Sequence, residues 1–233
     1  MTAEELQAAS GLSRAEARAL LAHALGVRRE HLVAHPTLDL SHTDAAVFSA
    51  LVARRLCGEP LAYLTGAQEF YGRRFAVTPD VLVPRPDTET LVDVALDCIR
   101  SLGATRVLEL GTGSGCIAIT LKLEHPELHL TATDISAAAL DVARRNATAL
   151  GADIAWLGGD WYSPVGDQRF DLIVSNPPYV AAGDPHLAAL AREPALALTD
   201  QADGLRCLAE IIQGAPVRLR RPGWLVVEHG WDQ

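Results

Sequence analysis

The sequence predicts an α/β protein built around a doubly wound, mostly parallel sheet, preceded by a small helical domain and a β-hairpin linker. Three observations predict this fold. Strand-like and helix-like segments alternate from residue 87 onward, the strand-like segments are short continuous apolar runs, and residues 1–57 show only helical spacing of apolar residues. The 233 residues are enough for one full α/β domain and a small second domain. We therefore expect a helical bundle at 1–57, a linker at 58–86 and the main domain at 87–233.

The helical bundle is expected from two amphipathic segments, 13–26 and 41–56. Ser13 and Glu16 have the spacing of a capping box at the start of the first helix, and Gly26 is expected to end it. Apolar residues recur at helical spacing in both segments, at Ala19, Leu20, Ala22, Leu25, Val47, Leu51, Val52 and Leu56. The region holds no group of candidate catalytic residues.

The linker 58–86 is divided into short segments by glycine and proline residues, which favour turns. These residues are Gly58, Pro60, Gly66, Gly72, Pro79, Pro84 and Pro86. The β-like residues of "EFYGRRFAV" surround Gly72, so we expect a hairpin with its turn at that glycine.

The main domain is expected to alternate strands and helices, as parallel sheets covered on both faces do. Helices are expected at 87–100, from about 115, at 136–149 and at 203–213. Strands are expected at 106–110, 128–134, 153–159, 170–176 and 223–230.

Composition excludes several classes of protein. No run of about 18 apolar residues is present, so no membrane-spanning helix is expected. The first residues lack the basic and apolar regions of a secretory signal, which predicts a cytoplasmic protein. The formal net charge of −9 disfavours nucleic acid as a partner, because Lys and Arg supply most of the non-specific affinity for phosphates. The cysteines form no C-x-x-C pair and have no histidine at ligand spacing, so neither a disulfide framework nor a metal site is expected at Cys57, Cys98, Cys116 and Cys207.

The segment "ELGTGSGC" follows the strand expected at 106–110 and is the first candidate ligand site. Glu109 lies at the end of this strand, and Gly111, Gly113 and Gly115 are expected to form the turn into the next helix, where a ligand can lie against backbone N–H groups. Asp134 ends the following strand, at the distance expected for the acidic residue that binds a ribose. Both segments fall at the carboxyl ends of parallel strands, where doubly wound sheets bind ligands. A nucleoside cofactor is therefore expected.

The glycines alone leave the identity of the cofactor open. The segment "GSGCIA" also satisfies the loose G-x-G-x-x-A pattern of dinucleotide-binding proteins, so a nicotinamide cofactor is one alternative. A glycine-rich turn that binds no ligand is another.

The corner "SNPPYV" at 175–180 distinguishes these alternatives. Asn176 leaves the strand expected at 170–176 and precedes a proline, which favours an extended backbone, and neither Pro177 nor Pro178 has an N–H to donate. The Asn176 side-chain oxygen and a neighbouring carbonyl can accept both hydrogens of a planar –NH₂ group, while Tyr179 offers a flat face for packing. If this strand lies beside the strand at 106–110, the corner opens next to the glycine turn. A turn with an asparagine cap is the alternative.

A clamp for a neutral –NH₂ group beside a nucleoside cofactor suggests methyl transfer from S-adenosylmethionine. The nitrogen of an amide or exocyclic amine is a poor nucleophile, because its lone pair is delocalised, and its pKa is far too high for a side-chain base. Asn176 is therefore expected to orient and polarise the acceptor nitrogen rather than act as a general base.

With these motifs and "GGDW" at 158–161, the chain resembles S-adenosylmethionine-dependent methyltransferases of the class I, Rossmann-like fold. The segments "GEPLAYLTGAQEFYGRRFAV", "VLVPRPDTETLV", "EPALAL", "DGL" and "VVEHGWDQ" closely resemble the HemK/PrmC family, the peptide chain release factor glutamine N(5)-methyltransferases. The resemblance covers nearly the whole chain, including the helical region. N-P-P-Y alone is less specific, because adenine-amino DNA methyltransferases share it.

The resemblance implies that the side-chain amide of the glutamine in the Gly-Gly-Gln motif of class I release factors is methylated. It implies an S-adenosyl-L-methionine site at Glu109, Gly111, Thr112, Gly113, Ser114, Gly115, Asp134, Trp161 and Asn176. It also implies a glutamine site at Asn176, Pro177, Pro178 and Tyr179, in which Asn176, Pro177 and Tyr179 are catalytic.

Some implied roles have a plain structural alternative. From the residues alone, Trp161 is equally well explained as a core aromatic side chain. Pro84 and Arg85 match the family's linker motif near the active site, whereas a solvent-facing turn would also explain them.

The end of the chain departs from the family pattern. The family's sheet is expected to continue beyond "VVEHGWDQ" for two more strands, roughly 40–50 residues. The resemblance therefore implies a C-terminally truncated sheet without these strands, and reduced stability of the chain as it stands.

Two other functions remain open at this point. A nucleic-acid N-methyltransferase would need a basic groove, which the charge disfavours. An adaptor that binds a translation factor through the helical bundle is the non-enzymatic alternative. The main interpretation implies class I release factors as protein partners, no direct contact with nucleic acid or membrane, and a monomer.

Overall fold

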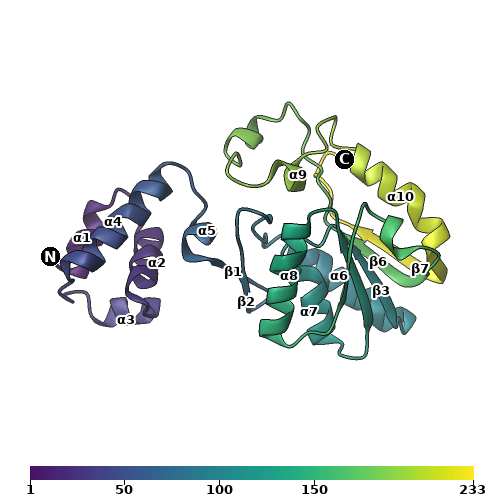
Figure 1. Ribbon diagram of the computed structural model, residues 1–233, viewed down its shortest axis with the longest axis horizontal. Helices are drawn as coiled ribbons and strands as arrows, with labels where there is room; N and C mark the ends of the chain where they lie inside the picture. The colour runs from purple at the N-terminus through teal and green to yellow at the C-terminus, as the bar shows by residue number, and fades with distance from the viewer. The chain divides into compact units, whose positions relative to one another are not determined.

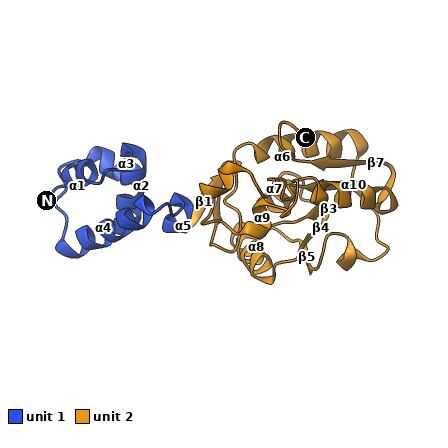
Figure 2. Cartoon of the chain, turned by 90° about the horizontal axis from the view of Figure 1, so that it is seen from above, with its two compact units in different colours: residues 1–66 blue, residues 67–233 orange.

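The computed structural model describes residues 1–233, which divide into two compact units, Met1–Gly66 and Ala67–Gln233 (Figure 2). The first unit is helical, and the second holds a β-hairpin, a five-stranded sheet and the helices that cover it. The expected three-part division at 1–57, 58–86 and 87–233 stays a prediction. The two compact units divide the expected linker between them: the helix at 61–65 belongs to the first unit and the hairpin to the second.

The first unit contains five helices: α1 (Ala3–Ala9), α2 (Arg14–Leu25), α3 (Arg29–Ala34), α4 (His42–Leu56) and α5 (Leu61–Thr65). The predicted capping box is present, since Ser13 Oγ accepts from Glu16 N and Glu16 Oε2 accepts from Ser13 N, each at 3.3 Å. Gly26 ends α2 with φ +65°, as predicted. The short helices α3 and α5 were not predicted from the apolar spacing.

The hairpin of β1 (Ala67–Phe70) and β2 (Arg73–Ala76) turns at Tyr71 and Gly72, which confirms the predicted turn. Both turn residues have positive φ, +52° and +70°, as a two-residue hairpin turn that follows the strand twist requires. Tyr71 also fastens the hairpin to helix α6 (Thr88–Leu102), because its backbone N–H donates to Glu89 Oε1 and its hydroxyl donates to Asp93 Oδ1, each at 2.8 Å.

The sheet has the strand order β5-β4-β3-β6-β7, and all four neighbouring pairs are parallel. The strands are β3 (Arg106–Leu110), β4 (His129–Asp134), β5 (Ala155–Gly158), β6 (Phe170–Ser175) and β7 (Leu219–Val227). The chain runs outward from β3 to β5 and then returns to place β6 on the other side of β3, as predicted. The strand order therefore reverses at β3, and the crevice expected for a ligand opens between the ends of β3 and β6.

Helices cover both faces of the sheet (Figure 1). Helices α6, α7 (Cys116–Glu124) and α8 (Ala137–Leu150) share one core with Val107 and Leu172, whereas the next residues along the strands, Leu108 and Ile173, pack with Ile211 of α10 (Arg206–Arg218) on the other face. This alternation of two apolar faces confirms the predicted doubly wound fold.

The last predicted helix has different limits from those expected. The sequence predicts residues 203–213, but α10 begins at Arg206 and continues through Pro216 in its last turns. The late start follows from Asp200, whose carboxylate accepts hydrogen bonds from the backbone N–H groups of Ala202, Gly204 and Arg206 at 2.8, 3.0 and 2.9 Å. These bonds hold residues 200–205 in a loop.

Two further features complete the fold. The segment after β6 carries the short helix α9 (Ala195–Leu198) and a 3₁₀ turn at Pro185–Ala188, and a second 3₁₀ turn lies at Ser163–Val165. None of the helices combines the length and apolar character needed to cross a bilayer.

Candidate active site

The glycine turn follows β3 and is held against the neighbouring strand. Gly111, Gly113 and Gly115 have φ values of +70°, +54° and +81°, in the left-handed region that favours glycine. The N–H groups of Gly111 and Thr112 both donate to Thr133 O in β4, at 2.9 and 3.0 Å. No atom lies within 4 Å of the place where a Cβ of Gly113 would stand, so the backbone there is open to a ligand.

Asp134 spans the turn from the end of β4. Its Oδ2 accepts from Gly113 N at 2.8 Å, and its Oδ1 accepts from Ser136 N at 2.9 Å. Burial raises the pKa of Asp134, while these two backbone hydrogen bonds act in the opposite direction. The carboxylate therefore stabilises the turn and lies at the cavity that the turn borders.

Glu109 supports the turn from inside the protein. Its side chain is fully buried, and its Oε2 accepts from Thr112 Oγ1 at 2.5 Å and from Ala118 N at 3.2 Å. Burial raises the pKa of Glu109 to about 8, and the hydrogen bonds from Thr112 and Ala118 oppose that shift. Glu109 does not line the cavity, so its expected contact with a cofactor stays a prediction.

The N-P-P-Y corner lies beside the glycine turn, as the order of the strands predicted. Ser175 Oγ donates to Leu110 O at 2.8 Å and so ties the end of β6 to the end of β3. Asn176 Nδ2 donates to Thr88 Oγ1 at 3.1 Å, which leaves Asn176 Oδ1 as an acceptor without a protein partner. Tyr179 donates its hydroxyl to Glu228 Oε1 at 3.1 Å, and burial raises the pKa of Tyr179 to about 12.

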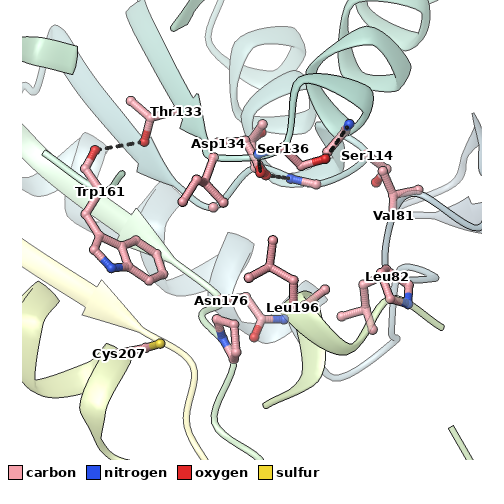
Figure 3. A pocket seen from close by; sticks show the side chains of 18 of the residues that line it. Val81, Leu82, Ser114, Thr133, Asp134, Ser136, Trp161, Asn176, Leu196 and Cys207 are labelled. Atoms are coloured by element: carbon pink, nitrogen blue, oxygen red, sulfur yellow. Dashed lines mark hydrogen bonds between the residues drawn. The ribbon is translucent and has the colours of Figure 1, made fainter. Parts of the chain in front are cut away.

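A cavity of about 450 Å³ joins the two motifs. Figure 3 shows Trp161 at one end and Leu82 at the other, with Asp134 and Asn176 on opposite sides. The cavity brings together most of the predicted site residues, namely Gly111, Thr112, Gly113, Ser114, Asp134, Trp161, Asn176 and Pro178. Four others do not line it: Glu109, Gly115, Pro177 and Tyr179.

Trp161 lines this cavity and also packs against the core on the α10 face of the sheet, so both expectations for it hold. Its indole Nε1 donates to Glu210 Oε2 at 2.9 Å, and its backbone oxygen accepts from Thr133 Oγ1 at 3.2 Å. The ring lies beside Gly111, with Cζ3 3.5 Å from where a Cβ of that glycine would stand. Trp161 has φ +39°, so the backbone is held in an uncommon conformation that aims the indole at the cavity.

The wall at residues 81–85 is held by a buried carboxylate on the segment that follows the corner. Glu193 Oε1 pairs with Arg85 Nη2 at 2.5 Å, and Glu193 Oε2 accepts from Val83 N at 3.0 Å. The Glu193 side chain is only 3% exposed. Pro84 and Arg85 both line the cavity, which excludes a simple solvent-facing turn.

Sequence reasoning missed Thr88, Glu193 and Glu210, whose hydrogen bonds reach Asn176, Arg85 and Trp161 respectively. Thr88 resembles an ordinary residue at a helix start, and Glu210 lies on an exposed part of α10. Glu193 and Thr88 did have a signal, since they lie in the segments "EPALAL" and "VLVPRPDTETLV", which resemble a known family.

Two protein-family models and one solved structure show what this chain is similar to. Residues 1–66 match the PrmC N-terminal domain family, and residues 88–199 match the methyltransferase small domain family. A solved methyltransferase from Pyrococcus furiosus is similar over 77% of this chain and 78% of its own, with a TM-score of 0.49 and 21% identity.

Two curated relatives are much more similar in sequence. The release factor glutamine methyltransferase of Bordetella pertussis is 54% identical over 233 residues, which cover 99% of this chain and 86% of that protein. The protein with the same name from Burkholderia pseudomallei is 48% identical over 241 residues, which cover 100% of this chain and 85% of its own. The resemblance that the motifs indicated is thus confirmed, and the chain belongs to the release factor glutamine methyltransferase family.

Proposed function

We propose that this chain transfers a methyl group from S-adenosyl-L-methionine to the side-chain amide nitrogen of the glutamine in the Gly-Gly-Gln motif of class I peptide chain release factors. Membership of the family supports the reaction. The observation that carries the proposal is the free acceptor Oδ1 of Asn176, which lies in the same cavity as the glycine turn. A cofactor and a primary amide can therefore meet in one cavity.

The cavity fits a nucleoside cofactor. Its volume of about 450 Å³ lies in the range of roughly 300–1,000 Å³ that is usual for ligand sites. The open backbone at Gly113 and the Asp134 carboxylate form a polar edge, while Trp161 offers an aromatic face. We assign cofactor binding to Gly111, Thr112, Gly113, Ser114, Asp134 and Trp161. When bound, S-adenosylmethionine supplies a methyl group made electrophilic by its sulfonium.

Asn176 would orient the acceptor amide. Its Oδ1 accepts one hydrogen of the glutamine –NH₂ group, and a carbonyl of the corner accepts the other. Correct positioning of the reacting atoms can supply roughly 7–11 kcal/mol of the barrier. Each hydrogen bond that the nitrogen donates to these oxygens should add about 1–3 kcal/mol as positive charge develops on it. Pro177 and Pro178 contribute by offering no competing donor, and Tyr179 completes the corner.

The proposal also concerns partners and place. The substrate is a protein, so no groove for nucleic acid is required, and the net charge of −9 agrees with that. We propose that the enzyme acts as a monomer in the cytoplasm, where release factors act.

A transfer assay with labelled cofactor tests the proposal. The substrates are a purified class I release factor, the same factor with its Gly-Gly-Gln glutamine changed to alanine, and duplex DNA. We expect label only on the unaltered factor, and we expect Asn176→Ala to abolish it. Label on DNA, or equal labelling of both release factors, would contradict the proposal.

A further inference from the structure

Thr88 lies directly behind the proposed catalytic asparagine. It is the first residue of α6, the residue is only 2% exposed, and it borders the same cavity as Asn176. Its Oγ1 accepts from Asn176 Nδ2 at 3.1 Å, although the two residues are 88 positions apart. No other partner of the Asn176 amide is found in the protein, so this bond alone fixes which end of the amide faces the cavity.

The orientation of this amide decides whether the site can hold its acceptor. An asparagine side chain has an acceptor end and a donor end, and a half turn exchanges them. A glutamine –NH₂ group can only donate, so Oδ1 must face the cavity and Nδ2 must face the protein. A buried N–H needs an acceptor. The Thr88 oxygen is the acceptor that the structure provides for Nδ2. The residue after Asn176 is a proline, which has no backbone N–H that could compete for Oδ1.

We infer that Thr88 is a positioning residue for the transfer reaction: its hydroxyl oxygen holds Nδ2 of Asn176 and so presents Oδ1 to the acceptor amide. This inference rests on the proposed function. Thr88 itself touches neither reacting atom, and its effect should appear in the alignment of the amide rather than in the binding of the cofactor.

The chain offers a direct spectroscopic readout, because it contains only two asparagines, Asn146 and Asn176. Selective ¹⁵N labelling of asparagine therefore gives two side-chain –NH₂ signal pairs. Thr88→Val removes the acceptor while keeping the shape, and we expect it to move the Asn176 pair and leave the Asn146 pair in place. An unmoved Asn146 pair also shows that the variant is folded, since Asn146 is buried and hydrogen-bonded.

Kinetics supply the second readout. Loss of one hydrogen bond at Asn176 should lower kcat about tenfold in Thr88→Val. The KM for the release factor and the Kd of S-adenosylmethionine should stay at their wild-type values. Thr88→Ser keeps the hydroxyl and should restore most of kcat and the position of the Asn176 signals.

Thr120→Val is the matched control. Thr120 is also a fully buried threonine on a helix, but its hydroxyl has no hydrogen-bond partner and it does not border the cavity. This variant should behave as the wild type in both measurements.

Two results would overturn the role of Thr88 while leaving the proposed function intact. One is an Asn176 signal pair that stays in place in Thr88→Val, and the other is a Thr88→Ser variant as slow as Thr88→Val. A wild-type enzyme that labels no release factor would instead overturn the proposed function, whatever the signals show.

Discussion

Asn146 and Ala76 are 70 residues apart in the sequence, yet they share two hydrogen bonds. Ala76 N donates to Asn146 Oδ1 at 2.8 Å, and Asn146 Nδ2 donates to Ala76 O at 3.0 Å. The same Nδ2 group also donates to Ser114 O in the glycine turn, at 2.9 Å. One buried amide on α8 therefore holds both the hairpin strand β2 and the turn that borders the cofactor site.

Asn146→Ala should weaken both stability and cofactor binding. Three hydrogen bonds are lost and the carbonyl of the buried Ser114 is left without this partner, so we expect a loss of about 2–4 kcal/mol in the free energy of unfolding. Ser114 lies in the glycine turn and lines the cavity, so loss of the bond to its carbonyl should also raise the Kd of S-adenosylmethionine. Urea unfolding and equilibrium binding measure the two effects. Thr148→Ala, an exposed change on the same helix, is the control, and equal urea midpoints for the two variants would contradict the prediction.

The buried Glu193 should matter for activity, because it holds Arg85 in the cavity wall and accepts from the backbone N–H of the adjoining Val83. Glu193→Gln keeps a hydrogen-bond acceptor but loses the charge, whereas Glu193→Ala loses both. We therefore expect kcat/KM for the release factor to fall modestly in the first variant and about tenfold or more in the second.

A surface pair provides the matched control for this prediction. Glu124 pairs with Arg73 at 2.6 Å, but both side chains are partly exposed and neither residue borders the cavity. Glu124→Gln should change the free energy of unfolding by at most about 1 kcal/mol and leave kcat/KM unaltered. If Glu124→Gln and Glu193→Ala lose activity equally, the proposed role of Glu193 is wrong.

Glu109 should make stability depend on pH. Burial raises the pKa of Glu109 from an ordinary 4.5 to about 8. At a pH between these two values, the folded protein holds a proton on Glu109 that the unfolded chain releases. The contribution of Glu109 to the free energy of unfolding is complete below its pKa in the unfolded chain, and it is lost as the pH rises through its pKa in the folded protein. The side chain in Glu109→Gln is neutral at every pH. The urea midpoint of this variant should therefore rise relative to that of the wild type as the pH is raised from about 5 to about 9. Parallel pH profiles for the two proteins would count against this explanation.

The sequence was sufficient for the features that depend on local patterns. The strands at Arg106–Leu110 and Phe170–Ser175 are rich in apolar residues, and the Gly72 turn and the Ser13 cap depend on neighbours in the chain. The position of Asn176 beside the glycine turn followed from the usual strand order of doubly wound sheets.

The remaining features depend on contacts between distant segments. The bonds from Asn176 to Thr88 and from Arg85 to Glu193 join residues 88 and 108 positions apart, and no local pattern specifies such pairs. The late start of α10 likewise depends on the Asp200 carboxylate, whose three backbone bonds keep residues 200–205 out of the helix. Apolar spacing alone extends the helix into that loop.

Gly115 should tolerate no side chain, for two separate reasons. Its φ of +81° is unfavourable for other residues, and a Cβ would lie 3.0 Å from Ile119 Cδ1, 3.1 Å from Ala143 Cβ and 3.2 Å from Trp156 Cη2. Gly115→Ala should therefore cost about 1–2 kcal/mol for the backbone and about 1–3 kcal/mol for crowding. Gly103 has φ +61° and no atom within 4 Å of a new Cβ, so Gly103→Ala should show only the backbone cost. The difference between the two urea midpoints measures the crowding that packs the glycine turn onto α7 and α8. If Gly103→Ala is as damaging as Gly115→Ala, the turn is not tightly packed there and backbone conformation alone explains the glycine.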